Sequence, residues 1–509
     1  MSTYLGVDIG TTGTKALLFN NKGEVLNTGR VNYPLLSPTP AVAEQEPDDI
    51  LKAVKKSIKA AVSLEGYDVT TLQFVSFSAA MHSVIAIDAF DTPITKCITW
   101  ADSRAVKWAD QIKETYGQTV YMRTGTPIHP MSPLAKITWL QHDEPDIFAR
   151  TAKFIGIKEY VFYNLFGEYI VDHSIASATG LFNLETKDWD AEALKIAGIT
   201  AEQLSKLVPT TTSITGLSEE IADKLGIPAT TPFIIGANDG VLSNLGVNAI
   251  DPGVVAVTIG TSGAIRTVTD KPLTDPKGRI FCYVLTEDHY VVGGPVNNGG
   301  MTLRWVRDEL APSEVEAAKR LGIDPYEVLT KIADRVKPGA DGLLFHPYLA
   351  GERAPLWNAN ARGSFFGLGL HHKREHMIRA VLEGVILNLY TVLLALEELI
   401  GVPQKIQATG GFARSELWRQ MMADIFNQPV TVPESYESSC LGAVVLGLYA
   451  TGEIEDFSIV SEWVGGTYHH EPIKENVAIY NDLTPIFIRL SRLLNDEYNS
   501  IVDFQNKWV

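Results

Sequence analysis

Two short loops combine glycines with hydroxyl-bearing residues, a composition suited to holding phosphate. The first is DIGTTGTK at residues 8–15, and the second is TIGTSG at residues 258–263. Glycines let backbone N–H groups approach phosphate oxygens without a Cβ in the way. Either loop alone could equally be a tight hairpin turn. Two such loops, one in each half of the chain, favour phosphate binding.

Two acidic residues stand where a predicted strand ends beside a turn. Asp8 begins the first loop, where a carboxylate can bind Mg²⁺ directly or through water, or can simply cap the turn. Asp239 can project its carboxylate into a cleft and accept the proton of a hydroxyl that attacks phosphorus. Asp239 is the middle residue of an Asn-Asp-Gly tripeptide, residues 238–240, and this sequence is most often only a turn. Lys15 could reach a phosphate or could be a solvated lysine at a strand end.

Two polar segments interrupt apolar strands and could hold a polyhydroxylated ligand. AMHS at residues 80–83 follows one predicted strand, and WADSR at residues 100–104 follows another. Their side chains could hydrogen-bond to hydroxyl groups and cover the C–H face of a polyol. His82 could instead be a half-buried histidine with satisfied hydrogen bonds, and Asp102 with Arg104 could be a surface ion pair.

The bulk composition is that of a globular enzyme with two domains. At 509 residues the chain exceeds what one hydrophobic core supports, so two large domains with a cleft between them are expected. The net charge of -17, without a stripe rich in Lys or Arg, argues against a nucleic-acid partner. The three cysteines are far apart and lack CxxC spacing, so neither a disulfide framework nor a zinc site is indicated.

The cellular compartment is predicted from signals that the sequence lacks. The N-terminus, MSTYLGVDIG, has no basic segment followed by a long apolar one. No window approaches the uninterrupted apolar run of about 20 residues that a membrane span requires. We therefore expect a cytoplasmic protein without a membrane partner.

The apolar patterns predict an α/β fold with a weak internal duplication. Strands are expected at residues 4–9, 16–19 and 25–30 as an antiparallel meander, then a helix at 48–63 and a strand at 74–78. This order is typical of a ribonuclease-H-like start. A comparable pattern of strands recurs at 254–259, 264–268 and 290–292. The domain boundary is predicted near Asn248, giving domains 1–247 and 248–509.

In their order along nearly the whole chain, these segments resemble the FGGY family of carbohydrate kinases in the actin-like ATPase superfamily. The most specific match is a spaced pattern over residues 363–383, with GSFFGL at its start and AVLE at its end. TGGFARS at residues 409–415 also falls in the expected place. The resemblance implies two ribonuclease-H-like domains of the actin/hexokinase type with a cleft between them. It also implies that ATP and Mg²⁺ are bound, with the sugar on the N-terminal domain and the nucleotide on the C-terminal domain.

The resemblance also implies roles for individual residues. Asp8 would be the metal-associated acid and Asp239 the catalytic base. The nucleotide-binding positions would be Thr12, Gly13, Thr14, Lys15, Gly260, Thr261, Gly300, Arg304, Gly411 and Ser415. The substrate-binding positions would be Met81, His82, Asp102, Arg104 and Asp239.

Within the family, long stretches such as AMHSVIAID and TWADSR are most similar to members that phosphorylate gluconate. This similarity implies conversion of D-gluconate to 6-phospho-D-gluconate with release of ADP. Kinases of xylulose or of another pentulose or polyol are the alternative, because xylulose kinases share the Met81-His82 pair. Glycerol kinases would show Arg-Glu there. A sugar- and ATP-binding regulator without catalytic activity is a further reading, since the fold alone does not determine activity.

A gluconate carboxylate in a chain this acidic needs a cation or several N–H donors. The candidates are Arg104, His129, Lys136, Lys158 and Arg353, each of which could also be a surface charge or a packing residue. The acidic, Trp-containing segment from Gly452 onward could support a homodimer.

Overall fold

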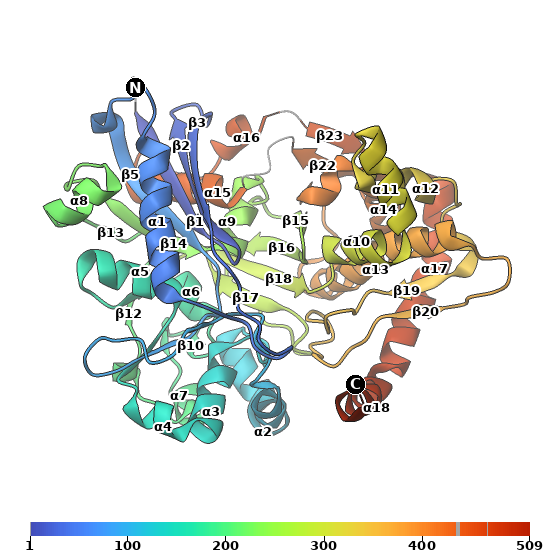
Figure 1. Ribbon diagram of the computed structural model, residues 1–509, viewed down its shortest axis with the longest axis horizontal. Coiled ribbons are helices and arrows are strands. Elements are labelled where there is room, and N and C mark those ends of the chain that lie inside the picture. The colour runs from blue at the N-terminus through green and yellow to red at the C-terminus, as the bar shows by residue number, and fades with distance from the viewer. Residues whose placement is uncertain (1, 434–437, 466, 509) are drawn as a thin grey trace. The chain divides into compact units, whose positions relative to one another are not determined.

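The computed structural model describes residues 2–433, 438–465 and 467–508. The chain folds into two compact units, and its helices and strands are labelled in Figure 1. The first unit comprises Met1–Pro252, Val268–Val292 and Glu437–Gly465, and the second comprises Gly253–Thr267, Gly293–Tyr436 and Gly466–Val509. Helices and strands are interspersed along the chain, and most strands form two large sheets with both parallel and antiparallel pairs, so the fold is of the α/β class.

The first unit is built on a six-stranded sheet that confirms the predicted antiparallel start. Its strands are, in sheet order, β13 (Ser213–Ile214), β14 (Phe233–Asn238), β5 (Leu72–Ala79), β1 (Thr3–Ile9), β2 (Gly13–Asn20) and β3 (Val25–Asn32). β1, β2 and β3 pair antiparallel, whereas β5 and β14 run parallel to β1. The carboxyl ends of the three parallel strands, β1, β5 and β14, therefore lie at one edge of the sheet.

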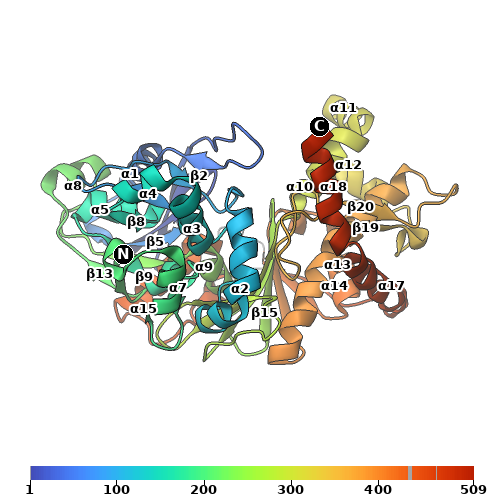
Figure 2. The same cartoon turned by 90° about the horizontal axis from the view of Figure 1, so that it is seen from below.

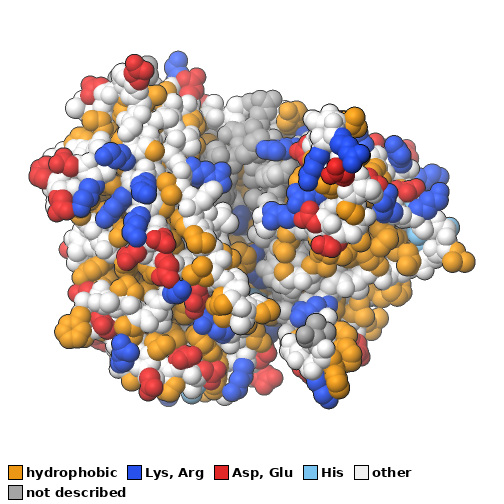
Figure 3. Space-filling model, in the orientation of Figure 1, with side chains coloured by type: hydrophobic (Ala, Val, Ile, Leu, Met, Phe, Trp, Pro, Cys, Tyr) orange, Lys and Arg blue, Asp and Glu red, His pale blue; other side chains and the backbone are white. Residues whose placement is uncertain are grey.

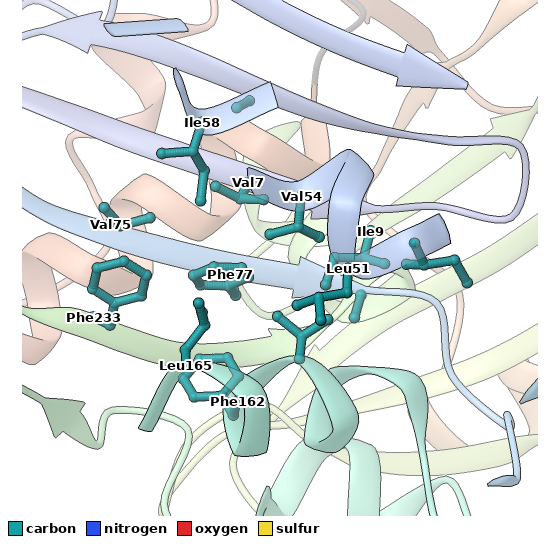
Figure 4. Close-up of a cluster of buried hydrophobic side chains, with 14 of the residues drawn as sticks. Val7, Ile9, Leu51, Val54, Ile58, Val75, Phe77, Phe162, Leu165 and Phe233 are labelled. Carbon is teal, nitrogen blue, oxygen red and sulfur yellow. The ribbon is translucent and has the colours of Figure 1, made fainter. Parts of the chain in front are cut away.

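Helix α1 (Pro47–Val62) covers one face of this sheet and confirms the predicted helix. Pro47 stands at its first position and Lys59 in its last turn, both favourable placements for a helix. Ile50, Val54 and Ile58 recur at helical spacing and are buried. Figure 4 shows Val54 and Ile58 in one cluster with side chains of β1, β5 and α5 (Ile157–Phe166). This core fixes β1 and β5 from one side.

The opposite face of the sheet is covered by α9 (Asp239–Gly246) and α15 (Ser438–Ala450). The two helices pack very closely, since a Cβ on Gly246 would lie 1.8 Å from the Ser438 carbonyl oxygen. A Cβ on Gly442 would lie 2.0 Å from the Leu242 carbonyl oxygen. In Figure 1 the late segment α15 lies beside α9. The first unit therefore contains chain from both halves of the sequence.

A second, seven-stranded sheet repeats the pairing of β1. Its strands are, in sheet order, β17 (Phe281–Val284), β18 (Tyr290–Val296), β16 (Gly263–Thr269), β15 (Val254–Ile259), β21 (Lys405–Thr409), β22 (Val430–Pro433) and β23 (Thr467–His470). β15 pairs antiparallel with β16 and parallel with β21. β1 has the same relation to β2 and β5, so the predicted internal duplication is confirmed in the strand pairing.

Helix α13 (Arg374–Ile400) is the longest helix of the second unit. Its neighbours include α14 (Glu416–Phe426) and α17 (Lys474–Leu493), as Figure 2 shows. Among the described residues it is the one helix long and apolar enough to cross a membrane by length and composition. Its most apolar window is 78% buried inside the protein, and it contains the buried ion pair Arg379–Glu383. These are the properties of a core helix.

The remaining helices and strands complete the two units. Further helices of the first unit are α2 (Val106–Thr124), α3 (Pro133–Asp143), α4 (Pro145–Arg150), α6 (His173–Ser177), α7 (Ala191–Ala197), α8 (Glu219–Leu225) and α16 (Val460–Trp463). Those of the second are α10 (Gly300–Trp305), α11 (Pro312–Leu321), α12 (Pro325–Ala333) and α18 (Asn495–Trp508). Short strands are β4 (Glu44–Gln45), β6 (Ile85–Ile87), β7 (Cys97–Ile98), β8 (Lys153–Ile155), β9 (Ile170–Asp172), β10 (Phe182–Asn183), β11 (Asp188–Trp189), β12 (Lys206–Val208), β19 (Leu344–His346) and β20 (Ser364–Phe366).

Candidate active site

Three parallel strands of the first unit place two predicted acidic residues at one edge of the sheet. The register puts Asp8 of β1 opposite Ser78 of β5, and Ser78 opposite Ala237 of β14. Adjacent strands lie about 4.8 Å apart, so the ends of β1 and β14 are roughly 10 Å apart. Asp239 directly follows β14. Asp8 and Asp239 therefore lie at the same edge of the sheet.

The carboxylate of Asp8 is held by a neighbouring strand. Ser78 Oγ donates a hydrogen bond of 2.7 Å to Asp8 Oδ1. Lys15 is the direct partner of Asp8 in the antiparallel pair of β1 and β2, so the two side chains lie on one face. Within the described residues, His, Cys, Asp and Glu form no group of three that could hold a metal. Asp8 fits a Mg²⁺ ion that takes most of its ligands from phosphate and water.

Side chains from three other segments hold the first glycine-rich loop. Tyr33 Oη donates to the Gly10 carbonyl oxygen at 2.6 Å, and Gln45 Nε2 donates to the Thr11 carbonyl oxygen at 2.6 Å. Trp100 Nε1 donates to Thr11 Oγ1 at 2.9 Å. These bonds fix two carbonyl oxygens toward the protein. An anion at the loop would then meet less repulsion from carbonyl dipoles.

The predicted phosphate-binding residues of this loop differ in their exposure. Thr12 is exposed, whereas Thr14 is fully buried with its hydroxyl 3.3 Å from Tyr33 Oη. Gly13 lies against β3, because a Cβ there would be 2.6 Å from Asn32 Oδ1. The hydroxyl of Thr14 thus faces the core, and Thr12 is the loop hydroxyl that faces outward.

Asp239 stands at a junction between a strand and a helix. Asn238 ends β14 and caps α9, where its Oδ1 accepts a 2.9 Å hydrogen bond from the Val241 N–H. Asp239 Oδ1 accepts a 2.7 Å bond from the Gly240 N–H. The N-terminus of a helix favours a negative side chain. The segment is thus more than a turn, and it presents a half-buried carboxylate at the sheet edge.

Met81 and His82 follow β5, the strand between those of Asp8 and Asp239. His82 is 5% exposed, and its Nδ1 lies 2.7 Å from the Ala178 carbonyl oxygen. Because a carbonyl oxygen only accepts, Nδ1 carries the hydrogen, and Nε2 of the neutral ring is then an acceptor. Met81 is half-buried and packs against the apolar cluster on the α9 face.

Asp102 and Arg104 form an ion pair, but Asp102 is no surface residue. Asp102 is 2% exposed, and its Oδ2 accepts from the Ala43 N–H at 3.0 Å. Arg104 Nη2 lies 2.8 Å from Asp102 Oδ2 and 2.5 Å from Glu44 Oε1. The guanidinium also lies over the ring of Trp139, 4.6 Å from its centroid. Direct contact of Asp102 or Arg104 with a sugar stays a prediction.

Lys136, a candidate for binding a ligand carboxylate, is instead bound to the backbone. Its side chain is fully buried, and Nζ donates to the carbonyl oxygens of His82 at 2.6 Å, Thr99 at 2.7 Å and Met131 at 2.9 Å. Burial lowers the pKa of Lys136 to about 7, although Asp102 favours the charged form. The ammonium therefore joins the loops of the predicted sugar site and has no donor left for a ligand.

Two other candidate cations also have protein partners. His129 is 8% exposed, and its Nδ1 accepts a 3.2 Å hydrogen bond from the Met131 N–H. Arg353, also 8% exposed, donates from Nη2 to the Val296 carbonyl oxygen at 3.1 Å. Lys158 is buried as well.

In the second unit, the turn after β15 lies against the start of α10. The Gly300 N–H donates to the Gly260 carbonyl oxygen at 2.7 Å, and the Met301 N–H donates to the Thr261 carbonyl oxygen at 3.1 Å. A Cβ on Gly299 would lie 2.5 Å from the Ser262 carbonyl oxygen. The structure thus brings together three of the predicted nucleotide positions, Gly260, Thr261 and Gly300.

Of the remaining predicted nucleotide positions, one lies on α10 and two follow β21. Arg304 is exposed on α10. Gly411 and Ser415 follow β21, the parallel neighbour of β15, and Ser415 Oγ caps α14 by accepting from the Trp418 N–H at 3.2 Å. These residues lie beyond the carboxyl ends of β15 and β21, which is where open α/β sheets bind ligands.

Glu352 is a buried acid that sequence reasoning missed. Its carboxylate accepts from the N–H groups of Asn297 at 2.6 Å and Arg353 at 2.8 Å. It also accepts from the side-chain amides of Asn298 at 3.0 Å and Asn388 at 2.9 Å. Burial raises the pKa of Glu352. The sequence signal that could have indicated Glu352 was its adjacent opposite charge, Arg353, within GERAP at residues 351–355. The carboxylate fixes the segment that leads directly into Gly299 and Gly300.

Comparison with known proteins places the chain in a family. Residues 3–246 match the N-terminal domain of the FGGY family of carbohydrate kinases, and residues 255–451 match its C-terminal domain. The chain belongs to the FGGY family. It is 62% identical to a gluconokinase of Bacillus subtilis (strain 168) over 508 residues, which are 99% of each chain.

Two solved structures from Lactobacillus acidophilus are close matches. One is described as a gluconate kinase and the other as a ligand-bound xylulose kinase; each has a TM-score of 0.92 and 38% identity. Both cover 98% of this chain, which covers 99% of the first and 100% of the second. The predicted α/β fold with two ribonuclease-H-like domains of the actin/hexokinase type is thereby confirmed.

Proposed function

We propose that the chain is an ATP-dependent gluconate kinase that converts D-gluconate and ATP into 6-phospho-D-gluconate and ADP. The observation that carries this function is the 62% identity to a gluconokinase over 99% of both chains. The edge of the first sheet supplies the chemistry, because Asp8 and Asp239 both lie there. A non-catalytic regulator would not need both carboxylates.

Asp239 acts as the general base in this mechanism. It accepts the proton of the terminal hydroxyl, expected to be on C6, while that oxygen forms a bond to the γ-phosphorus and the bond from phosphorus to the β,γ-bridging oxygen breaks. ADP leaves with the bridging oxygen, and the proton passes from Asp239 to solvent. Gly240 N–H and the start of α9 hold the carboxylate in place for this role.

The other residues divide between the sugar acid and the nucleotide. In the first unit, His82 Nε2 accepts a hydrogen bond from a sugar hydroxyl, and Met81 contacts the carbon chain. In the second, Gly260, Thr261, Gly300, Arg304, Gly411 and Ser415 bind ATP. Asp8 would hold Mg²⁺, which would supply charge neutralisation at the transferred phosphoryl group. In the first loop, Thr12, Gly13 and Lys15 supply donors to phosphate, whereas the buried hydroxyl of Thr14 supports the loop through Tyr33.

The proposed substrates indicate the cellular compartment of the enzyme. Gluconate and ATP are small cytoplasmic metabolites in the proposed reaction, so we place the protein in the cytoplasm. On the face drawn in Figure 3, basic and acidic side chains are interspersed. An anionic sugar acid then depends on local donors at the strand ends.

A xylulose kinase is the second candidate, favoured by one observation. One of the two L. acidophilus structures is described as a ligand-bound xylulose kinase, at the same 38% identity as the gluconate kinase. Small changes in a pocket can exchange such substrates, because discrimination between polar ligands depends on the few protein groups that hydrogen-bond to them.

ADP release measured with gluconate, xylulose, ribulose and glycerol separates these functions. We expect kcat/KM for gluconate to exceed that for each other substrate at least about 100-fold. A higher value for xylulose would replace the proposed substrate. Lack of ADP release with all sugars, despite ATP binding, would favour a regulator. Asp239→Asn should lower kcat about 1,000-fold with the dissociation constant of ATP nearly unchanged.

A further inference from the structure

Lys158 is a buried cation directly beside the strand that leads to Asp239. It lies on α5 and is 2% exposed. Its Nζ donates to the carbonyl oxygens of Ile235 at 3.0 Å and Ala237 at 3.3 Å, near the end of β14. Nζ also lies 2.6 Å from Asp172 Oδ2. The ammonium is therefore committed to protein partners, which argues against its binding a substrate carboxylate.

Asp172 connects this ammonium to the other side of the same strand end. It is fully buried, and its Oδ1 accepts a 2.9 Å hydrogen bond from the Ile175 N–H at the start of α6. In α6, Ser174 Oγ accepts from Asn238 Nδ2 at 2.9 Å and from the Asn238 N–H at 3.2 Å. Asn238 immediately precedes Asp239. Contacts from α5 and α6 thus converge on the last residues before the proposed base.

The charges around Lys158, like its contacts, connect it to Asp239. Burial lowers the pKa of Lys158, and Asp172, Glu159 and Asp239 each favour its charged form. This interaction is mutual, so the ammonium also favours the ionised carboxylate of Asp239. An ionised carboxylate is the form that can accept a proton.

We propose that Lys158 and Asp172 are a positioning pair for Asp239, which fixes the end of β14 and keeps a positive charge near the base. The pair acts through Asp239 and does not touch the substrate. This role rests on the proposed function, because the assignment of Asp239 as the base does.

A double-variant series separates this role from plain structural support. Removing one member of a buried ion pair leaves an unpaired charge, so Lys158→Met should lower Tm strongly. Lys158→Met/Asp172→Asn removes both charges and keeps a capping side chain on α6, so most of the lost Tm should return. We expect kcat of this double variant to stay at least about 10-fold below wild type, with KM for ATP within twofold.

The pH profile supplies a readout that a structural role would not move. In Lys158→Gln, which keeps N–H donors without the charge, the acidic limb of the kcat profile should shift to higher pH, because Asp172 keeps its negative charge while the charge that favours ionised Asp239 is gone. The double variant also loses the negative charge of Asp172, so its shift should be smaller, and Lys158→Gln serves if the double variant does not fold. Lys158→Arg should restore the wild-type profile.

The matched control is Lys153→Met. Lys153 also donates to backbone carbonyl oxygens, those of Glu202 at 3.0 Å and Leu204 at 3.2 Å, but on β8. Its kcat and pH profile should equal those of wild type. Recovery of both Tm and kcat in the double variant, with an unshifted profile in Lys158→Gln, would overturn the positioning role. Wild-type turnover in Asp239→Asn would instead overturn the base assignment, so the two failures are distinguishable.

Discussion

The two units fix their predicted ligand-binding turns with buried charges of opposite sign. In the first, the Lys136 ammonium donates to the carbonyl oxygens of His82, Thr99 and Met131. In the second, the Glu352 carboxylate accepts from the Asn297 N–H and the Asn298 amide, next to the turn at Gly299. Each ion is satisfied by dipoles of the segments that it positions. Each of these two side chains thus fixes several loops. A change at Lys136 should therefore affect the binding of gluconate, and a change at Glu352 the binding of ATP.

The largest effect is expected for Lys136→Met. Three buried carbonyl oxygens would lose their donor, at a cost of about 1–3 kcal/mol each in unfolding free energy. The loop carrying His82 would loosen, so KM for gluconate should rise about 30-fold while KM for ATP stays within twofold. Steady-state kinetics in both substrates and a thermal melt measure this. An equal rise in both KM values would contradict the division of roles.

Glu352→Gln should have the complementary effect. The isosteric amide presents an NH₂ group to some of the donors that the carboxylate accepted, which leaves them unsatisfied. KM for ATP should rise about 10-fold, with KM for gluconate nearly unchanged. Glu327→Gln is the control, since Glu327 pairs with Lys331 on the exposed surface of α12. A selective change in KM for gluconate would refute the comparison.

A pH titration sharpens the comparison further. Burial lowers the pKa of Lys136 from 10.5 to about 7, so between about pH 7 and 10.5 the unfolded chain binds a proton that the folded chain lacks. Stability from this group therefore rises with pH in that window. The neutral amine, however, has two N–H groups for three carbonyl oxygens. KM for gluconate should rise about fivefold from pH 6 to 9, and Lys136→Arg, which stays charged, should suppress this rise. Identical profiles would exclude Lys136 as the cause.

The smallest effect is expected for Tyr33→Phe. It removes the hydrogen bond to the Gly10 carbonyl oxygen, worth about 1 kcal/mol, together with the 3.3 Å contact to Thr14 Oγ1, and leaves Gln45 and Trp100 on the loop. kcat/KM for ATP should fall about threefold, measured by initial rates. A loss above about 30-fold would mean that Tyr33 alone fixes the loop.

The sequence predicted the elements whose signals are local. The β-branched residues of β1, the glycines of both loops and the spacing of Ile50, Val54 and Ile58 in α1 each specify an element without distant partners. Asp239 was placed at a strand end for the same reason. Its helical continuation into α9 was not foreseen, because Asn238-Asp239-Gly240 is compatible with either a turn or a helix cap.

Other features depend on contacts between distant segments, which one sequence does not reveal. Lys136 and Lys158 were candidates to bind a carboxylate because each is a cation, with a surface charge as the alternative, and only the structure shows both buried. α15 packs against α9 through Gly246 and Gly442, about 200 residues apart in the chain. The prediction of a single boundary near Asn248 did not include the return of the chain to the first unit at α15.

The central claim, phosphorylation of gluconate, is tested most directly by identifying the product. ³¹P and ¹³C NMR of protein incubated with ATP, Mg²⁺ and D-gluconate should show one phosphate monoester, on C6, formed in step with ADP. Asp239→Asn should give almost none in the same time. A monoester on another carbon would contradict the proposed reaction, and its absence beside rapid phosphorylation of xylulose would contradict the proposed substrate.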